Sequence, residues 1–174
     1  MSTPTAAGPQ TCLGAFSSPG ATPTPWAATE GALRRTQKFQ LCTVRRDGRP
    51  HVTPVLAVWA FGAMWFTTGD GEQKAVNLGA NQHCALTSGT GTLTGVDHVV
   101  EGTAGLITDE ATRDAVATAF EEAYGWHLTR EDGTWYGLGD AVRTGNVALY
   151  GVRPHQAFAF AAGSESSQTR YRWS

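Results

Sequence analysis

Residues 41–81 constrain the fold more than any other part of this 174-residue chain, because β-rich runs alternate there with turn signals. Asp47-Gly48 is a typical hairpin turn, and Phe61-Gly62 marks a second turn farther along the chain. Apolar and β-branched residues around these turns predict strands at residues 41–45, 51–59 and 63–68. Three antiparallel strands that follow one another form a meander, which is the expected centre of the fold.

The second of these strands has a regular face and an irregular position. Its alternation places one set of side chains on a common face, namely His51, Thr53, Val55, Ala57 and Trp59. Pro54 lies in the middle of the strand and has no N–H for a ladder, so we expect an edge strand or a bulge there. A bulge would leave backbone groups free to contact a flat ligand, whereas an ordinary edge strand explains the proline without one.

The segment after the third strand predicts an anion site. Residues 72–78 have the pattern of a short helix, with Lys74 in its first turn. A cation there is opposed by the helix dipole, by roughly 0.3–1 kcal/mol, but a bound phosphate would favour both the lysine and the helix N–H groups. Thr67 and Thr68 add two hydroxyl donors just upstream. The alternative is a solvated lysine whose unfavourable interaction is screened by salt.

The remaining chain predicts a mainly β fold of the α+β class. Four more strands are expected, at residues 83–88, 96–108, 146–152 and 155–161. With the meander they suit an antiparallel barrel that carries one substantial helix and short flanking helices. Residues 1–25 are rich in Ser, Thr, Ala, Gly and Pro and are expected to be disordered, which leaves residues 26–174 as the folded domain.

The substantial helix is expected at residues 109–124, with Asp109 as its N-cap. Its apolar face consists of Val116, Ala119, Phe120 and Ala123. A shorter helix within residues 26–38 is expected to lay Trp26 and Leu33 on the barrel. Residues 126–143 have weak periodicity and several glycines, so they are expected to form a long loop.

Composition and missing motifs exclude several classes of function. A net charge of −2 and a pI near 6.2 provide no general attraction to nucleic acid or to an anionic membrane. We expect a cytoplasmic protein, since no apolar run is long enough to span a membrane and the start of the chain lacks a secretory signal pattern. The three cysteines form neither a disulfide framework nor a zinc motif, and the five histidines have no metal-ligand spacing. Hydrolase, P-loop and dinucleotide-fold motifs are also missing.

The end of the chain predicts a docked segment. Arg170 and Arg172 fall on one side of an extended tail, and Tyr171 and Trp173 fall on the other. Arginine suits a phosphate or carboxylate, and tryptophan suits the cover of a ring. The alternative is that the tail docks on the barrel of its own chain.

Several short motifs together resemble the flavin-binding split barrels related to pyridoxamine 5'-phosphate oxidase. They are D-G-R-P-H-V-T-P (47–54), V-W (58–59), F-T-T-G (66–69), K-A-V-N-L-x-A-N (74–81), V-V-E-G-T-A (99–104) and Q-T-R-Y-R-W (168–173). The resemblance implies an antiparallel split β-barrel that binds FMN, and a homodimer with two cofactor sites at its interface. The cofactor contacts expected on this basis are His51, Thr53, Pro54, Val55, Thr67, Thr68, Lys74, Gln168, Arg170, Arg172 and Trp173.

Three functions follow as hypotheses. The first is an FMN-dependent oxidoreductase acting on a small molecule, in which the cofactor performs the hydride chemistry. The second is a reductase that uses the deazaflavin coenzyme F-420 in place of FMN. The third is a flavin- or haem-binding module without turnover. The sequence identifies neither the substrate nor a catalytic acid or base, since His98 and Glu101 suit a hydrogen-bonded or exposed strand pair better than an acid–base pair.

Overall fold

The computed structural model of the protein describes residues 8–124, 127–129 and 135–173. Its strands are β1 (Gln10–Leu13), β2 (Phe39–Val44), β3 (Pro50–Val55), β4 (Ala57–Ala60), β5 (Ala63–Thr68), β6 (His83–Ser88), β7 (Gly95–Leu106), β8 (His127–Thr129), β9 (Trp135–Gly137), β10 (Ala148–Ala162) and β11 (Ser167–Arg172). The helices are α1 (Trp26–Arg35), α2 (Gln73–Ala80), α3 (Glu110–Tyr124) and α4 (Leu138–Thr144). None of the described helices is both long and apolar enough to cross a membrane.

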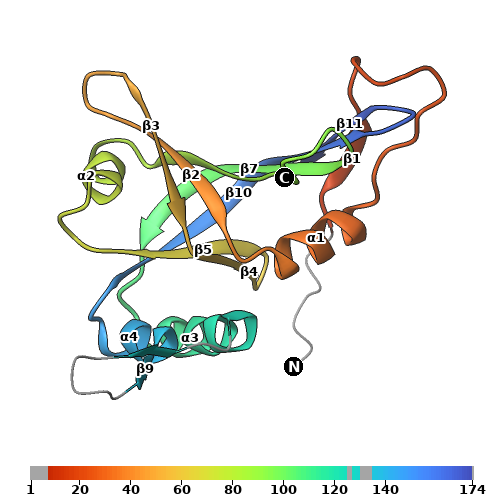
Figure 1. Cartoon of the computed structure of the whole chain (residues 1–174). Helices are drawn as coiled ribbons and strands as arrows, with labels where there is room; N and C mark the ends of the chain where they lie inside the picture. The colour runs from red at the N-terminus through yellow and green to blue at the C-terminus, as the bar shows by residue number, and fades with distance from the viewer. Residues whose placement is uncertain (1–7, 125–126, 130–134, 174) are drawn as a thin grey trace.

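Nine of the strands form one antiparallel sheet, which is the split barrel of an α+β fold (Figure 1). Its main path runs β1-β11-β10-β7-β6-β2-β3, and β5 joins it by pairing with both β10 and β4. One edge of β10 serves two partners in turn, because residues 148–152 pair with β5 and residues 156–161 pair with β11. The expected fold class is therefore confirmed.

Both predicted hairpin turns are present. Gly48, between β2 and β3, has φ +84°, which a glycine adopts without steric cost. Phe61 and Gly62, between β4 and β5, have φ +53° and +74°, so both central residues of that two-residue turn are left-handed, as in a type I′ hairpin. The two pairs of strands on either side of these turns are in continuous register.

The single strand predicted at residues 51–59 is wrong, since the structure divides it into β3 and β4 at Leu56. β3 pairs with β2 and β4 pairs with β5, so the expected meander is bent at its middle strand. The division follows from burial, because every side chain of β4 is buried and Val58 packs in a second apolar cluster with α3. Pro54 lies in the edge strand β3 without a register shift, so the edge explanation is correct and the bulge is not.

The two strands predicted at residues 146–152 and 155–161 are one continuous strand, β10. The register between β10 and β7 shifts between Pro154 and Gln156, which leaves His155 as a bulged residue. Gly102 lies opposite Pro154, and a Cβ there would overlap the carbonyl oxygen of Arg153. The strand thus bends at the proline without ending there.

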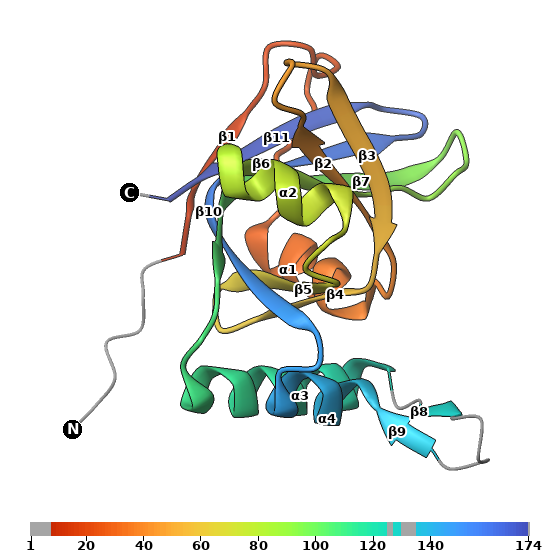
Figure 2. The same ribbon diagram turned by 90° about the vertical axis from the view of Figure 1, so that its left-hand side faces the viewer.

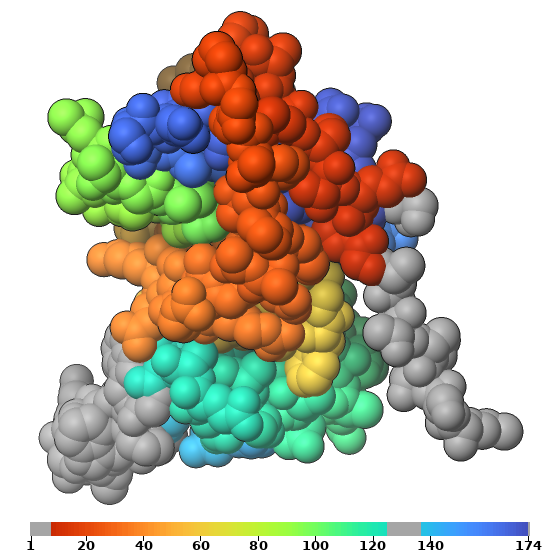
Figure 3. All heavy atoms as spheres, turned by 90° about the vertical axis from the view of Figure 1, so that its right-hand side faces the viewer, coloured from red at the N-terminus to blue at the C-terminus, as the bar shows by residue number. Residues whose placement is uncertain are grey.

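The expectation of disorder at residues 1–25 is wrong for the described part of that segment. β1 pairs with β11 along its whole length, and residues 8–25 (red) pack over the C-terminal strand (blue) in Figure 3. The phenol of Tyr171 donates to the carbonyl oxygen of Thr24 at 2.7 Å and lies 2.8 Å from the Thr29 hydroxyl. A segment without apolar periodicity is therefore ordered by backbone pairing and a buried hydrogen-bond network.

The helices confirm three predictions and correct one. Trp26 and Leu33 of α1 pack on the main core, and the Thr112 N–H donates to the Asp109 carboxylate at 2.8 Å at the start of α3. The apolar face of α3 packs in the second cluster as expected.

The described part of the expected loop at residues 126–143 contains most of α4, which lies beside α3 below the barrel (Figure 2). A Cβ at Gly139 would overlap the Glu121 carboxylate, so this glycine permits close helix packing where the sequence indicated a loop. The remaining residues of that expected loop, 126 and 130–134, lie outside the described residues.

Candidate functional site

The end of the barrel that carries α2 contains most of the expected phosphate contacts. β5 ends at Thr68, and Lys74 is the second residue of α2, as predicted. The Lys74 side chain is only 8% exposed, so the alternative of a solvated lysine is wrong. A buried ammonium needs an anionic partner, because desolvation without one is costly.

Glu72 is that partner, and we did not identify it from the sequence. It occupies the N-cap position of α2, and its carboxylate pairs with the Lys74 ammonium. The Gly69 N–H donates to the same carboxylate at 2.9 Å. The hydrogen bond from Lys74 is the main cause that lowers the pKa of Glu72, and the Gly69 N–H and the Thr68 hydroxyl also lower it. An acidic residue two positions before a helix-start lysine was the available signal.

A chain of polar side chains, buried at Asn77 and Thr43, fixes α2 against β2. The Asn77 amide donates to the Thr43 hydroxyl at 2.9 Å, and Gln73 donates to Asn77 at 2.7 Å. The same Thr43 hydroxyl lies 3.4 Å from Nδ1 of His51 on β3. His51 and Lys74 therefore belong to one end of the barrel, where α2 packs on β2, the neighbour of β3.

In β3, the strand expected to contact a cofactor ring, only some of the side chains are accessible to a ligand. Val55 is buried in the main core, where its side chain cannot meet a ligand. Pro54 is exposed, while Thr53 is half-buried and points to the other side of the strand. A ring placed on this strand would meet the Pro54 side or the backbone.

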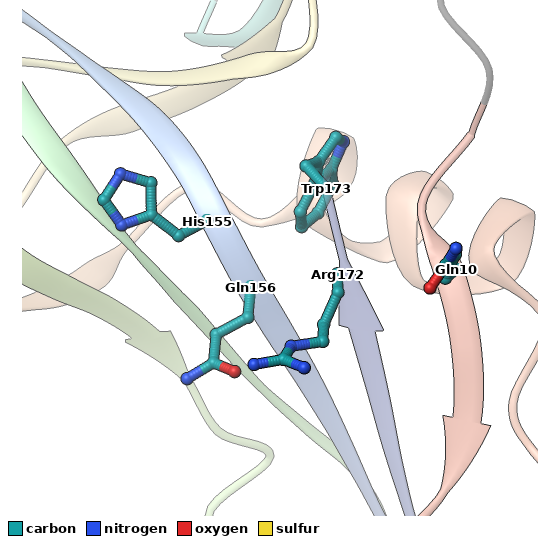
Figure 4. Close-up of a pocket in the computed structure, with 5 residues that line it drawn as sticks. All are labelled: Gln10, His155, Gln156, Arg172 and Trp173. Carbon is teal, nitrogen blue, oxygen red and sulfur yellow. The ribbon is translucent and has the colours of Figure 1, made fainter.

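Three of the four predicted C-terminal contacts lie on β11, on the side opposite to Tyr171. Gln168, Arg170 and Arg172 stand across from Phe160, Phe158 and Gln156 of β10, respectively. A cavity of about 450 Å³ is lined by Arg172 and Trp173 together with Gln10, His155 and Gln156. Figure 4 shows Arg172 and Gln156 extending toward the same space.

This cavity adjoins a second cavity of about 400 Å³, and the two share His155 and Gln156. The second cavity reaches β2 and β3 through Thr43 and Pro50. The imidazole of His155, which lines both cavities, lies 3.0 Å from the Thr103 hydroxyl. Both cavities are open, and together they cross the sheet from the strands next to α2 to the C-terminal strand.

Trp173 packs on its own barrel, as the alternative for the tail predicted. Its ring centroid lies 5.0 Å from that of Trp26 and 6.2 Å from that of Trp59. Tyr171 is fully buried in the core. Arg170 differs from both, because its Nε is buried without a hydrogen-bond partner among the described atoms.

Other reactive side chains do not assemble into a second centre in the described part of the chain. His98 is buried on the inner face of β7, and Glu101, on the opposite face, accepts a hydrogen bond from Gln156 at 2.7 Å. Burial raises the pKa of Cys84 to about 12, so its thiol is not a nucleophile. No group of three potential metal ligands is found among the described residues.

The chain separates the two expected anion sites. In Figure 1, α2 lies at one side of the barrel, whereas β1 and β11 lie at the other. Lys74, Thr68 and His51 therefore belong to the α2 end, and the predicted contacts Gln168, Arg170 and Arg172 on β11 do not. Thr67 lies on the opposite face of β5 from Thr68, so it is not part of the α2 group.

Comparison with known proteins agrees with this architecture. The family model described as pyridoxamine 5'-phosphate oxidase matches residues 26–159. No curated protein matches the sequence. Among solved structures, a putative 5-nitroimidazole antibiotic resistance protein from Bacteroides thetaiotaomicron has a TM-score of 0.63 at 15% identity, covering 96% of this chain and 93% of that chain.

Two further structures have the same fold. An F420 reductase has a TM-score of 0.54 at 23% identity, over 74% of this chain and 94% of its own. A haem-binding protein from Mycobacterium smegmatis has a TM-score of 0.58 at 16% identity, over 84% of this chain and 59% of its own. With the family model matching most of the chain over an antiparallel split barrel, the protein belongs to the pyridoxamine 5'-phosphate oxidase family.

Proposed function

We propose that the protein is an FMN-dependent oxidoreductase whose cofactor phosphate binds at the start of α2. The observation that carries this proposal is the burial of Lys74 at that helix start, within the part of the chain that the family model matches. The substrate is a small molecule whose identity the site does not define.

The groups at this helix start fit a phosphate. The Lys74 ammonium and the Gly69 N–H already interact with a carboxylate, that of Glu72, whose oxygens stand in for those of a phosphate. Helix N–H groups and an ammonium both favour an anion. The local donor set is thus suited to a negatively charged group.

The other residues of this end would position the cofactor. Thr68 would add a hydroxyl donor to the phosphate, and Pro54 with the backbone of residues 53–55 would lie against the ring system. His51, held by Thr43, would be a polar contact near the ring. A bound flavin supplies the hydride transfer, while the protein supplies binding and orientation.

The proposal includes a homodimer, because one chain places α2, which carries Lys74, and β11, which carries Arg170 and Arg172, at opposite sides of the barrel (Figure 1). A second subunit could bring Arg170, Arg172 and Trp173 to the cofactor held by the first. The outer side of the sheet suits such a contact, since it has exposed apolar residues, Val44, Val52 and Phe160. A monomer in light scattering at micromolar concentration would remove this part of the proposal.

Two alternatives have a specific observation in their favour. The similarity to an F420 reductase, at 23% identity, supports a deazaflavin-dependent reductase. The similarity to a haem-binding protein supports a binding module without turnover. A cytoplasmic location is consistent with all three functions and stays a prediction.

Cofactor titration of the purified protein tests these functions. The experiment measures affinity for FMN, for the deazaflavin F420 and for haem, and then turnover with a reduced nicotinamide. We expect tight binding of FMN and oxidation of the nicotinamide in its presence. Tighter binding of F420 than of FMN would favour the deazaflavin-dependent reductase. Binding of a cofactor without turnover with any electron donor would favour the binding module.

A further inference from the structure

The carboxylate of Glu72 occupies the position that an anionic ligand of α2 would take. We propose that Glu72 is an internal competitor of the cofactor phosphate, so that this residue sets how strongly the site prefers a phosphorylated cofactor. The inference rests on the proposed function, because it concerns the same α2 site.

The first support is the sharing of donors. Glu72 accepts the Gly69 N–H at 2.9 Å and pairs with Lys74, and its pKa is also lowered by the Thr68 hydroxyl. The Gly69 N–H and the Lys74 ammonium are donors that a phosphate at this helix start would also use. An incoming phosphate therefore has to replace Glu72 at some or all of them.

The second support is the charge balance of the helix start. The described first turn of α2 contains no acidic residue, and the Glu72 side chain makes no capping hydrogen bond to the helix. The ammonium of Lys74 thus lies near the positive end of the helix dipole, and its described anionic partner is Glu72. Without a ligand, this carboxylate is what compensates the buried charge.

The third support is the difference in burial within the pair. The Lys74 side chain is 8% exposed, whereas the Glu72 side chain is 53% exposed. Glu72 can therefore turn into solvent without disturbing the packing, and Lys74 cannot. Exchange of one anion for another would need only this rotation, which makes Glu72 the residue that moves.

The consequence is a measurable penalty for phosphate. Part of the favourable interaction of phosphate with Lys74 is offset by the loss of the Glu72 contact. Repulsion between the two anions adds to this cost if Glu72 stays nearby. A neutral residue in place of Glu72 removes both the competing contact and the repulsion. Phosphate binding should therefore strengthen, while binding of an unphosphorylated flavin should not change.

Two variants of the full chain test the proposal. Glu72→Gln removes the charge and keeps the size of the side chain. Glu72→Ser removes the charge and introduces a favoured N-cap residue, which protects the helix if the first variant folds poorly. Glu110→Gln is the matched control, because Glu110 is also a glutamate at a helix start and is exposed.

The probes are inorganic phosphate, FMN and riboflavin, measured by calorimetry and flavin fluorescence. We expect both Glu72 variants to bind phosphate and FMN about tenfold more tightly than the wild type, because one charged contact no longer competes with the phosphate. Riboflavin affinity should stay unchanged, and Glu110→Gln should behave as the wild type. Adding Lys74→Met to Glu72→Ser should abolish the gain.

Unchanged or weaker phosphate binding in folded Glu72→Ser would overturn the proposal. An equal gain in Glu110→Gln would overturn it too, because the effect would then come from net charge. Failure of every variant to bind FMN and riboflavin would contradict the flavin function instead. The phosphate measurement would still decide the role of Glu72 in that case.

Discussion

The α2 end and the β11 strand were both expected to hold an anionic part of the cofactor, and the structure makes them different kinds of region. Lys74 at the α2 end is buried and paired with a carboxylate that solvent can reach. β11 is a strand within the sheet, with Tyr171 in the core and Arg172 exposed at the surface. The first region holds a buried charge that needs an anion, whereas the second is primarily structural.

The difference between the two regions shows that a basic residue does not by itself define an anion-binding site. Lys74 needs a partner because it is buried, so its charge has to be balanced by Glu72 or by a ligand. Arg172 is exposed and remains hydrated without one. Energetic dependence on an anion is therefore expected for Lys74 and not for Arg172, and four predictions test this contrast.

Deletion of residues 168–174 should have the largest effect. The sequence places this tail after the last predicted strand, at residues 155–161, but in the structure it contains most of β11, which pairs with both β1 and β10. The deletion removes the buried Tyr171 and exposes two strand edges, so we expect loss of cooperative folding. Circular dichroism during heating measures this. A truncated protein with the melting temperature of the full chain would contradict the structural role of β11.

Lys74→Ala should weaken cofactor binding about ten- to a hundredfold, because charge-assisted hydrogen bonds are worth roughly 1.5–3 kcal/mol each. The unliganded protein should stay folded, since the remaining Glu72 side chain is largely exposed and can be hydrated. Calorimetric titration with FMN gives the affinity. An unchanged dissociation constant would remove the assignment of the phosphate to α2.

Arg172→Ala should have a smaller effect. Its side chain lines the cavity of about 450 Å³ and is exposed, so the melting temperature should not change. If a second subunit uses this residue, FMN affinity should fall about two- to tenfold, as for one solvent-accessible contact with an anion. The same titration measures it, with Arg46→Ala as an exposed control. A fall in the melting temperature would show that Arg172 supports the strand.

Protonation of Glu72 in acid should produce the smallest of the four effects, at the α2 end. The pKa of Glu72 is lowered from its ordinary value of 4.5, chiefly by Lys74, so the folded state holds this carboxylate ionised more strongly than the unfolded state does. The resulting stabilisation is present above pH 4.5 and is lost as the pH falls through the folded-state pKa.

Melting temperatures of the wild type and of Glu72→Gln should therefore converge in acid. The comparison needs a pH series from about pH 6 to about pH 3. A difference between the two proteins that stays constant over this range would mean that the Lys74 pair contributes no pH-dependent stability.

The sequence by itself determined the features that depend on neighbouring residues. The two turns needed left-handed residues, the start of α3 needed a cap at Asp109, and the position of Lys74 in a short helix followed from local periodicity. These features are recoverable from sequence because each depends on interactions within a few positions. The motif series that identified the family belongs to the same category.

Only the tertiary structure decided which strands pair and which charges meet. β1 has no local signal of a strand, and it forms because β11 offers a free edge to it. The strand at residues 51–59 divides because two separate apolar clusters bury β4 on both faces. The pairing of Lys74 with Glu72 depends on how deeply packing buries the lysine, and burial is the sum of contacts that lie far apart in the chain.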